Sequence, residues 1–160
     1  MKKKDNQNSV VAFGVHGWFH IIYMMLMFWF YAGMVNDSSN VVAPAVAKKL
    51  GIPAGSVLNM GTVAAMVGVI FFFATGAFNR KIGPRVTSFI CLILGGVGYF
   101  GMGHANSLAQ YAVALCICTI GCMSAGYISG GAFVAQWFPK KKGIVMGYPT
   151  MVHNTSTGLF

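Results

Sequence analysis

Histidine and tyrosine side chains recur on one face of an apolar segment near the start of the chain. His16, His20, Tyr23, Met27 and Tyr31 are three or four residues apart, which places them on one side of a helix. Imidazole and phenol groups in such a stripe can contact a solute or transfer protons, or they can hydrogen-bond to a neighbouring helix. Both roles stay open for His20, whereas for His16 we favour the bond to a helix.

Two later apolar segments also carry polar side chains. Tyr127 stands among glycine and alanine residues, and Asn154 belongs to an unusually polar segment near the end of the chain. Single hydroxyl groups in apolar helices mostly serve packing or backbone hydrogen bonds, so we select only these two residues. The solute-binding residues that we predict are therefore His20, Tyr23, Tyr127 and Asn154.

The scarcity of acidic residues excludes most enzyme chemistry. No Asp or Glu follows Asp37, which leaves no carboxylate pair for glycoside hydrolysis, no hard-metal site and no carboxylate-supported catalytic triad. His16 and His20 have the spacing of two metal ligands, but no third ligand lies near them in the sequence. We expect no enzymatic activity, no metal and no cofactor.

A glycine pattern that can bind nucleotides has a structural explanation here. Gly96, Gly98 and Gly101 match the dinucleotide-binding pattern G-x-G-x-x-G, but they lie inside an apolar segment without the strand and the acidic residue that this pattern needs. We interpret them, and the small residues that follow Gly121, as sites where helices pack closely.

The distribution of charge shows which elements position these residues. The chain is 56% hydrophobic and only 8% charged, where a soluble domain carries about 25% charged residues. A charge at the centre of a membrane-spanning helix costs roughly 2.5–3.5 kcal/mol, and each crossing takes about 20 apolar residues. The charge-free stretches therefore predict spans at 13–35, 57–78, 86–102 and 109–133, with an incomplete fifth at 144–160. The predicted fold is an all-α, polytopic membrane helical bundle.

The positive charges predict an orientation. Of the 11 Lys and Arg residues, only Lys48 and Lys49 fall in the first connection, and the others lie at the N-terminus and in the second and fourth connections. Because cytoplasmic segments are enriched in Lys and Arg, we expect residues 1–12 to form a cytoplasmic tail and residues 13–160 a multi-pass domain of the cell membrane. The net charge of +9 would suggest nucleic acid as a partner of a soluble protein, but here the positions of the charges matter more than their sum. Contact of the basic segments with lipid headgroups is a secondary expectation.

The second connection, G-A-F-N-R-K-I-G-P-R from Gly76 to Arg85, contains a recognisable motif. It resembles the loop G-x-L-A-D-[RK]-x-G-[RK]-[RK] that members of the major facilitator superfamily carry between spans two and three. Gly76, Lys81, Gly83 and Arg85 match this loop, whereas Arg80 occupies its acidic position. These five residues form the predicted gating loop.

Two further segments resemble the same superfamily. The stretch W-F-P-K-K-K-G from Trp137 to Gly143 is similar to the join W-F-P-x-x-[RK]-G between spans four and five, which recurs in carboxylate carriers such as the oxalate:formate and monocarboxylate transporters. Asp37 and Asn40, followed by Val41–Pro44, look like the first outer loop. The resemblance thus extends along the chain and favours the carboxylate branches.

The resemblance implies a transporter of two six-span halves, with the solute held between them and access alternating by rocking of the halves. In the family, the loop acid caps a helix of the other half. Arg80 would repel the positive end of that helix, so either Asn79 replaces the acid as a neutral cap or the loop makes different contacts. Gly76 and Gly83 keep their roles, which are close helix approach and a tight turn.

The sequence therefore favours the N-terminal part of a secondary transporter for a small solute, with an organic anion such as a carboxylate preferred. The expected partners are the solute, a coupling proton, membrane lipid and a missing C-terminal half that supplies the cation for an anionic solute. A neutral solute such as a sugar is one alternative, because the complete spans contain no fixed cation. A non-transporting membrane scaffold is another. The fifth segment is too short to span the bilayer, which favours a partial chain over the scaffold.

We predict that Lys48→Cys reacts with an impermeant thiol reagent added from outside the cell, because the first connection is expected to be extracellular. Lys141→Cys is expected to react only after the membrane is permeabilised. Mass-shift labelling of each variant, compared with the parent protein, measures both reactions. The opposite pattern would reverse the predicted topology.

Overall fold

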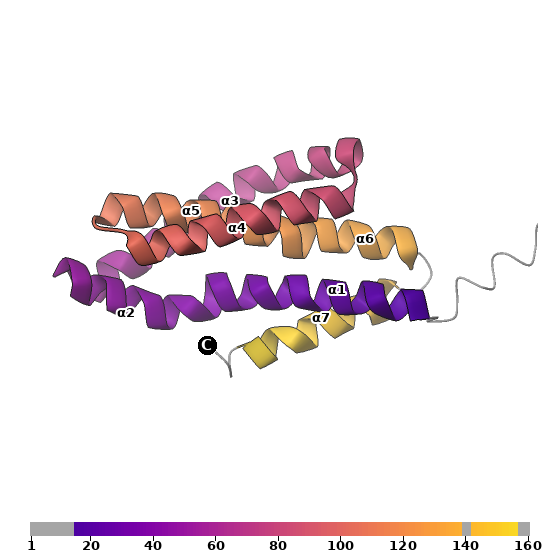
Figure 1. Ribbon diagram of the computed structural model, residues 1–160, viewed down its shortest axis with the longest axis horizontal. Coiled ribbons are helices and arrows are strands. Elements are labelled where there is room, and N and C mark those ends of the chain that lie inside the picture. Colours follow the sequence, from indigo (N-terminus) through magenta and orange to yellow (C-terminus); the bar gives the residue numbers. More distant parts are fainter. Residues whose placement is uncertain (1–14, 139–141, 157–160) are drawn as a thin grey trace, which may run out of the picture.

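The computed structural model describes residues 15–138 and 142–156, the side chains of residues 15, 16, 153 and 154 excepted. The described part of the chain is a bundle of helices without a strand (Figure 1), which confirms the all-α prediction. Within these described ranges, four helical runs are long and apolar enough to cross a membrane: Gly17–Leu50, Ala54–Ile82, Pro84–His104 and Leu108–Trp137. The end of the fifth predicted span, residues 157–160, lies outside the described residues.

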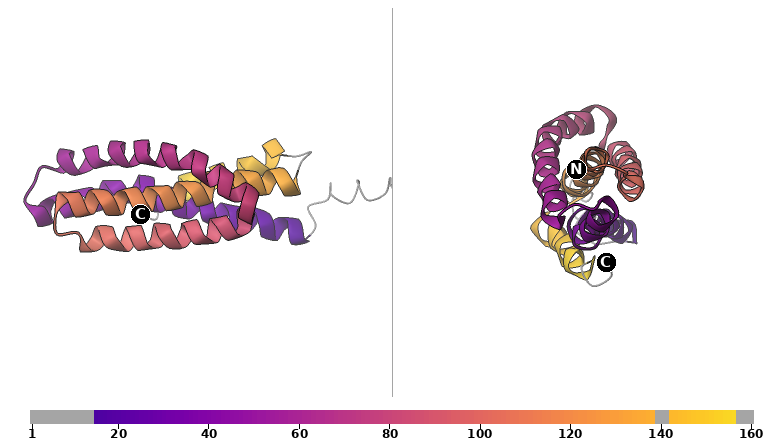
Figure 2. Two further views of the ribbon diagram at one scale, coloured as in Figure 1. Left: turned by 90° about the horizontal axis from the view of Figure 1, so that it is seen from above. Right: turned by 90° about the vertical axis from the view of Figure 1, so that its left-hand side faces the viewer.

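Two of the four runs contain a π-helical segment. The first run consists of α1 (Val15–Tyr31), the π-segment η3 (Ala32–Asp37) and α2 (Ser38–Leu50). The second and third runs are α3 (Ala54–Ile82) and α4 (Pro84–His104). The fourth consists of α5 (Leu108–Met123), the π-segment η4 (Ser124–Ser129) and α6 (Gly130–Trp137), and α7 (Lys142–Ser156) follows. Successive runs are antiparallel (Figure 1 and Figure 2).

The residues in the turns at both ends of the bundle suit the backbone conformations found there. Gly51 and Gly83 have φ angles of 68° and 93°, which residues with a Cβ atom rarely adopt. Pro84 starts α4 directly after the Gly83 turn, at a position where the missing N–H has no helical partner to lose. At the other end, Ser107 caps α5 by accepting a hydrogen bond from the Gln110 N–H at 3.2 Å. We call the two ends the Gly83 end, where α1 begins, and the Gly51 end, where α4 turns into α5.

The segment predicted as the first outer loop is part of a helix instead. Asp37, Asn40 and Val41–Pro44 lie in the unbroken run from α1 through η3 into α2. The Ser38 hydroxyl donates to the Met34 carbonyl at 2.6 Å, so the widened π-segment keeps a satisfied backbone and the helix continues. The loop prediction for these residues is therefore wrong.

Glycines bring α4 and α5 into backbone contact. A Cβ atom on Gly98 would lie 2.4 Å from the Cys118 nitrogen, and one on Gly121 would lie 2.4 Å from the Gly95 nitrogen. No side chain fits at such distances, so the two helices meet where glycine leaves room for the opposite backbone. The interpretation of the glycine run as a packing site is confirmed at Gly98, whereas a Cβ on Gly96 would meet no described atom within 4 Å.

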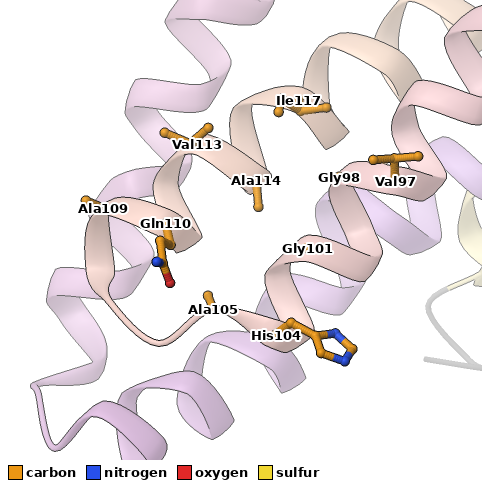
Figure 3. Close-up of a pocket in the computed structure, with 10 residues that line it drawn as sticks. All are labelled: Val97, Gly98, Gly101, His104, Ala105, Ala109, Gln110, Val113, Ala114 and Ile117. Carbon is orange, nitrogen blue, oxygen red and sulfur yellow. The ribbon is translucent and has the colours of Figure 1, made fainter.

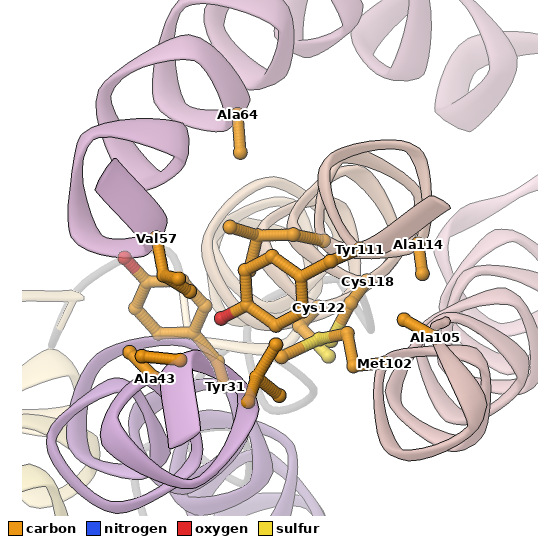
Figure 4. Close-up of a cluster of buried hydrophobic side chains, with 13 residues drawn as sticks. Tyr31, Ala43, Val57, Ala64, Met102, Ala105, Tyr111, Ala114, Cys118 and Cys122 are labelled. Carbon is orange, nitrogen blue, oxygen red and sulfur yellow. The ribbon is translucent and has the colours of Figure 1, made fainter. Parts of the chain in front are cut away.

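The fourth helical run lies at the centre of the bundle. Helix α5 packs against α3 and α4, and η4 packs against α1 (Figure 2). The larger core cluster draws Tyr31, Met102, Tyr111, Cys118 and Cys122 from α1, α4 and α5 (Figure 4). A second cluster joins α1, α6 and α7. The buried cysteines pack as small apolar side chains.

We predict that Gly121→Ala destabilises the protein by about 1–3 kcal/mol, because the added methyl group would press on the backbone of α4. Gly96→Ala is the matched control, since no described atom lies within 4 Å of the added group, and it should be neutral or stabilising. Thermal unfolding in detergent, followed by circular dichroism, compares the two variants. Equal midpoints would contradict the backbone contact.

Candidate functional site

Two predicted site residues from separate helices meet at the Gly83 end. Arg85 lies in the first turn of α4, and its Nη2 atom is 3.0 Å from the Nε2 atom of His20 on α1. A guanidinium group can only donate hydrogen bonds, so Nε2 of His20 accepts this one. The contact joins the predicted gating loop to the predicted solute-binding stripe.

Two aromatic rings of α6 pack against this pair. The guanidinium carbon of Arg85 lies 5.4 Å from the centre of the Phe133 ring and 5.6 Å from that of Trp137. The His20 ring stacks on Phe133 with ring centres 4.9 Å apart, and its centre lies 4.1 Å from that of Trp137. Cation–π attraction of about 0.5–1 kcal/mol per exposed pair holds the arginine over these rings. The start of α4 is thus tied to both α1 and α6.

A groove of about 320 Å³ opens beside the Arg85–His20 pair. It is lined by Phe19, His20, Tyr23, Arg85, Phe89 and Phe133. Arg85 has further N–H groups besides the one that His20 accepts, and Tyr23 adds a hydroxyl group. The groove therefore offers hydrogen-bond donors between aromatic walls, an arrangement that suits a small anion with an apolar part.

The other two predicted solute contacts do not line this groove. Tyr127 belongs to η4 and is 42% exposed. Its ring packs edge-on against Phe28 and Tyr31, with ring centres 4.9 and 5.0 Å apart. These contacts hold the phenol ring in place. The segment that carries Tyr127 is π-helical, and π-helical segments are frequent at functional sites. Asn154 belongs to α7, and its side chain lies outside the described residues.

Buried polar side chains join α3 to η4. The hydroxyl oxygens of Thr75 and Ser124 are 2.8 Å apart, and Ser129 donates to Oδ1 of Asn79 at 3.1 Å. Asn79 is only 8% exposed, and its Nδ2 atom has no partner among the described residues. The side chain of Asn79 therefore points into the helical bundle that this chain forms. Of the two alternatives for this loop, the burial favours different contacts over a neutral cap at Asn79.

The remaining residues of the predicted gating loop have different surroundings. Arg80 and Lys81 are exposed in the last turn of α3, and Gly83 forms the tight turn. A Cβ on Gly76 would meet no described atom within 4 Å. The close helix approach predicted at Gly76 is therefore not found within the described part of the bundle.

A second groove, of about 500 Å³, lies between α4 and α5 at the Gly51 end (Figure 3). Its polar side chains serve the helix ends: Nδ1 of His104 is 3.1 Å from a carbonyl oxygen of its own helix, and Oε1 of Gln110 accepts from the Asn106 N–H at 3.0 Å. Nearby, Lys49 of α2 donates to the Ala105 carbonyl at 2.9 Å, as cations often do beyond a helix C-terminus. We assign these groups to closing the end of the bundle.

Sequence reasoning missed the contact between Arg85 and His20. It assigns Arg85 to a loop and His20 to a cavity, and the two residues are 65 positions apart. A comparison of the predicted depths of the two residues in the membrane could have found the contact. Arg85 starts the third span and His20 lies near the start of the first, so both belong to the same end of the bundle.

We predict that Ser129→Ala lowers the free energy of unfolding by about 1–3 kcal/mol, because it removes the partner of the buried Asn79 amide. Asn79→Leu combined with Ser129→Ala should recover most of this loss, since the pair then leaves no buried polar group without a partner. A double-mutant cycle of unfolding free energies in detergent measures the coupling. Strictly additive losses would show that the two side chains do not interact.

Comparison with known proteins agrees with this helical bundle. The sequence model of the Major Facilitator Superfamily matches residues 11–160, nearly the whole chain. No curated protein and no solved structure is significantly similar to it. Members of the superfamily are membrane transporters of small solutes rather than enzymes. The chain therefore belongs to the Major Facilitator Superfamily.

Proposed function

We propose that this chain forms one wall of a secondary carrier that moves a small organic anion, with carboxylates favoured, by alternating access. The observation that carries the proposal is the groove at the Gly83 end, where Arg85 and His20 stand between aromatic side chains. The proposal goes beyond the family assignment, which supports transport of a small solute without naming its class.

The charge of Arg85 favours an anionic solute. A guanidinium group offers N–H donors in a planar fork that matches a carboxylate, and the contact with His20 uses only part of that fork. The groove volume of about 320 Å³ falls within the range of small-molecule sites, roughly 300–1,000 Å³. A carboxylate suits the polar side of the groove, and an apolar substituent suits the space between Phe19 and Phe89.

Tyr127 and Asn154 extend the proposed solute path beyond this groove. Tyr127 exposes part of its ring on η4, and Asn154 lies in the last turn of α7. Solute sites of secondary transporters typically lie near the membrane midplane on interrupted helices. A solute that enters beside Arg85, His20 and Tyr23 would therefore move towards these residues.

The proposed gate is the loop with Gly76, Arg80, Lys81, Gly83 and Arg85. Arg80 and Lys81 are exposed and so can contact a second six-span half, which supplies the opposite wall of the cavity. The described cations of this end lie on the cytoplasmic side in the proposed orientation, which follows the positive-inside rule. The carrier then works in the cell membrane.

Uptake by the purified transporter in liposomes tests the proposal, with radiolabelled oxalate and glucose as probes. Arg85→Gln should lower the initial rate of oxalate uptake about tenfold, which corresponds to about 1.4 kcal/mol of lost binding. Lys142→Gln should change that rate by less than about twofold, since the side chain of Lys142 does not line the groove. Lys142 is a matched control because it is an exposed cation at the same end and does not line the groove.

The outcomes separate the competing functions. Equal oxalate rates for Arg85→Gln and Lys142→Gln would contradict the role of Arg85. Uptake of glucose without uptake of oxalate would replace the anion by a neutral solute. A well-folded transporter that moves neither probe, nor a wider panel of small anions and sugars, would favour the scaffold.

A further inference from the structure

An apolar groove of about 440 Å³ runs along the bundle between α3 and α4. These two helices lie on either side of α5 and meet at the Gly83 turn (Figure 2). The walls of the groove include exposed apolar side chains of both helices, namely Phe71, Phe78, Ile82, Ile90 and Leu94. Residues of α5 and η4 form its floor. The groove therefore opens outwards from the described bundle, and it is separate from the groove beside Arg85.

The three hydroxyl groups that line this groove already have partners within the protein. The Thr75 hydroxyl donates to the Phe71 carbonyl at 3.0 Å, and its oxygen lies 2.8 Å from the hydroxyl oxygen of Ser124. Thr87 donates to the Gly83 carbonyl at 2.9 Å. Because none of these hydroxyl groups needs a polar ligand, a hydrocarbon chain complements the groove, and close packing against its walls holds the chain there.

The length of the groove matches one leaflet of a bilayer. From Phe71 to Ile82, α3 rises about 17 Å. The hydrocarbon core of a bilayer is about 30 Å thick, so each leaflet contributes about 15 Å of it. Ile82 and Thr87 stand on either side of the Gly83 turn, so the groove starts at that end and reaches about the middle of the membrane. An acyl chain of this leaflet can therefore lie in the groove along its whole length.

The charge at the mouth of the groove suits an anionic headgroup. Lys81 is exposed, and it follows the lining residues Ala74 and Phe78 by seven and three positions, which places it on the same side of α3. Its ammonium group can bind a phosphate as a point charge. Asp37, the only acidic residue in the described part of the chain, lies about 25 Å of helix from His20 at this end. No carboxylate of the described residues therefore competes with a lipid phosphate here.

We infer that this groove binds an anionic phospholipid such as phosphatidylglycerol, with one acyl chain between α3 and α4 and the phosphate beside Lys81. In the proposed orientation the Gly83 end is cytoplasmic, and the cytoplasmic leaflet is the one that carries anionic lipids. The bound lipid fills the space between the two helices next to the proposed gating loop. The inference goes beyond the proposed function and does not depend on which solute the carrier moves.

Native mass spectrometry of the full transporter in detergent provides the first test. The probes are phosphatidylglycerol and phosphatidylcholine with identical acyl chains. Ala74→Phe places a ring in the groove and should lower the affinity for phosphatidylglycerol about tenfold, which corresponds to about 1.4 kcal/mol. Ala77→Phe is the matched control, because Ala77 is also exposed on α3 but does not line the groove. Equal affinities of the two variants would overturn the inference.

Removal of a single charge tests the headgroup. Lys81→Gln should lower the affinity for phosphatidylglycerol about fivefold, which corresponds to about 1 kcal/mol for a basic residue near a lipid surface, and should leave that for phosphatidylcholine unchanged. Arg80→Gln removes the same charge, but Arg80 is two residues from both Phe78 and Ile82 and so lies on another side of α3. Equal losses in these variants, or displacement of the lipid by free glycerol phosphate, would overturn the proposed site.

Photochemical cross-linking provides a second test in a bilayer. The full transporter is placed in liposomes of equal parts phosphatidylglycerol and phosphatidylcholine. The photoreactive residue p-benzoylphenylalanine in place of Phe78 should cross-link phosphatidylglycerol preferentially. In place of Phe73, which is exposed on α3 but does not line the groove, it should cross-link both lipids alike. Mass spectrometry of the adducts identifies the lipid. Equal adducts at position 78, or a cross-link from it to another segment of the protein, would contradict the lipid site.

Discussion

The bundle depends on the contact between the backbones of α4 and α5. In a bilayer, apolar side chains gain little by leaving lipid for one another, so helices associate where small residues allow close approach. Gly98 and Gly121 provide this approach, and a Cβ atom on either would overlap the opposite backbone. Because α5 is held against α4, the fourth helical run lies in the centre, and α3 and α1 pack on its other sides.

Irregular backbone occurs where the first and fourth runs cross. A Cβ atom on Gly126 in η4 would lie 3.2 Å from the Cβ of Tyr31, which directly precedes η3. The glycine therefore lets η4 approach the end of α1, and Tyr127 packs its ring on Tyr31 beside this contact. Non-helical or widened backbone at membrane depth is tolerated where it is buried in protein or lines a cavity. Both segments contain buried residues, which meets the first of these conditions.

Much of this architecture could be predicted from the sequence, because the membrane imposes simple rules on charge and glycine. Stretches without charge predict long helices, and an all-helical fold follows. Contacts between distant residues could not be predicted: the sequence does not show that Asn79 pairs with Ser129, or that Arg85 reaches His20. Asp37 was mispredicted for a different reason. A run of short polar residues is typical of a loop, but here serine hydroxyls satisfy the carbonyls of a widened helix.

The first helical run contacts a cation at one depth and carries an acidic residue at another. Arg85 meets His20 near the Gly83 end, and Asp37 lies about 25 Å of helix further on. At that separation two unit charges interact by only about 0.7 kcal/mol at an effective dielectric constant of about 20, so Arg85 does not neutralise Asp37. The attraction that Arg85 exerts on an anion is therefore nearly independent of the charge on Asp37. His20 and Asp37 belong to one continuous run of helix, so a rocking motion of this half would move the two residues together.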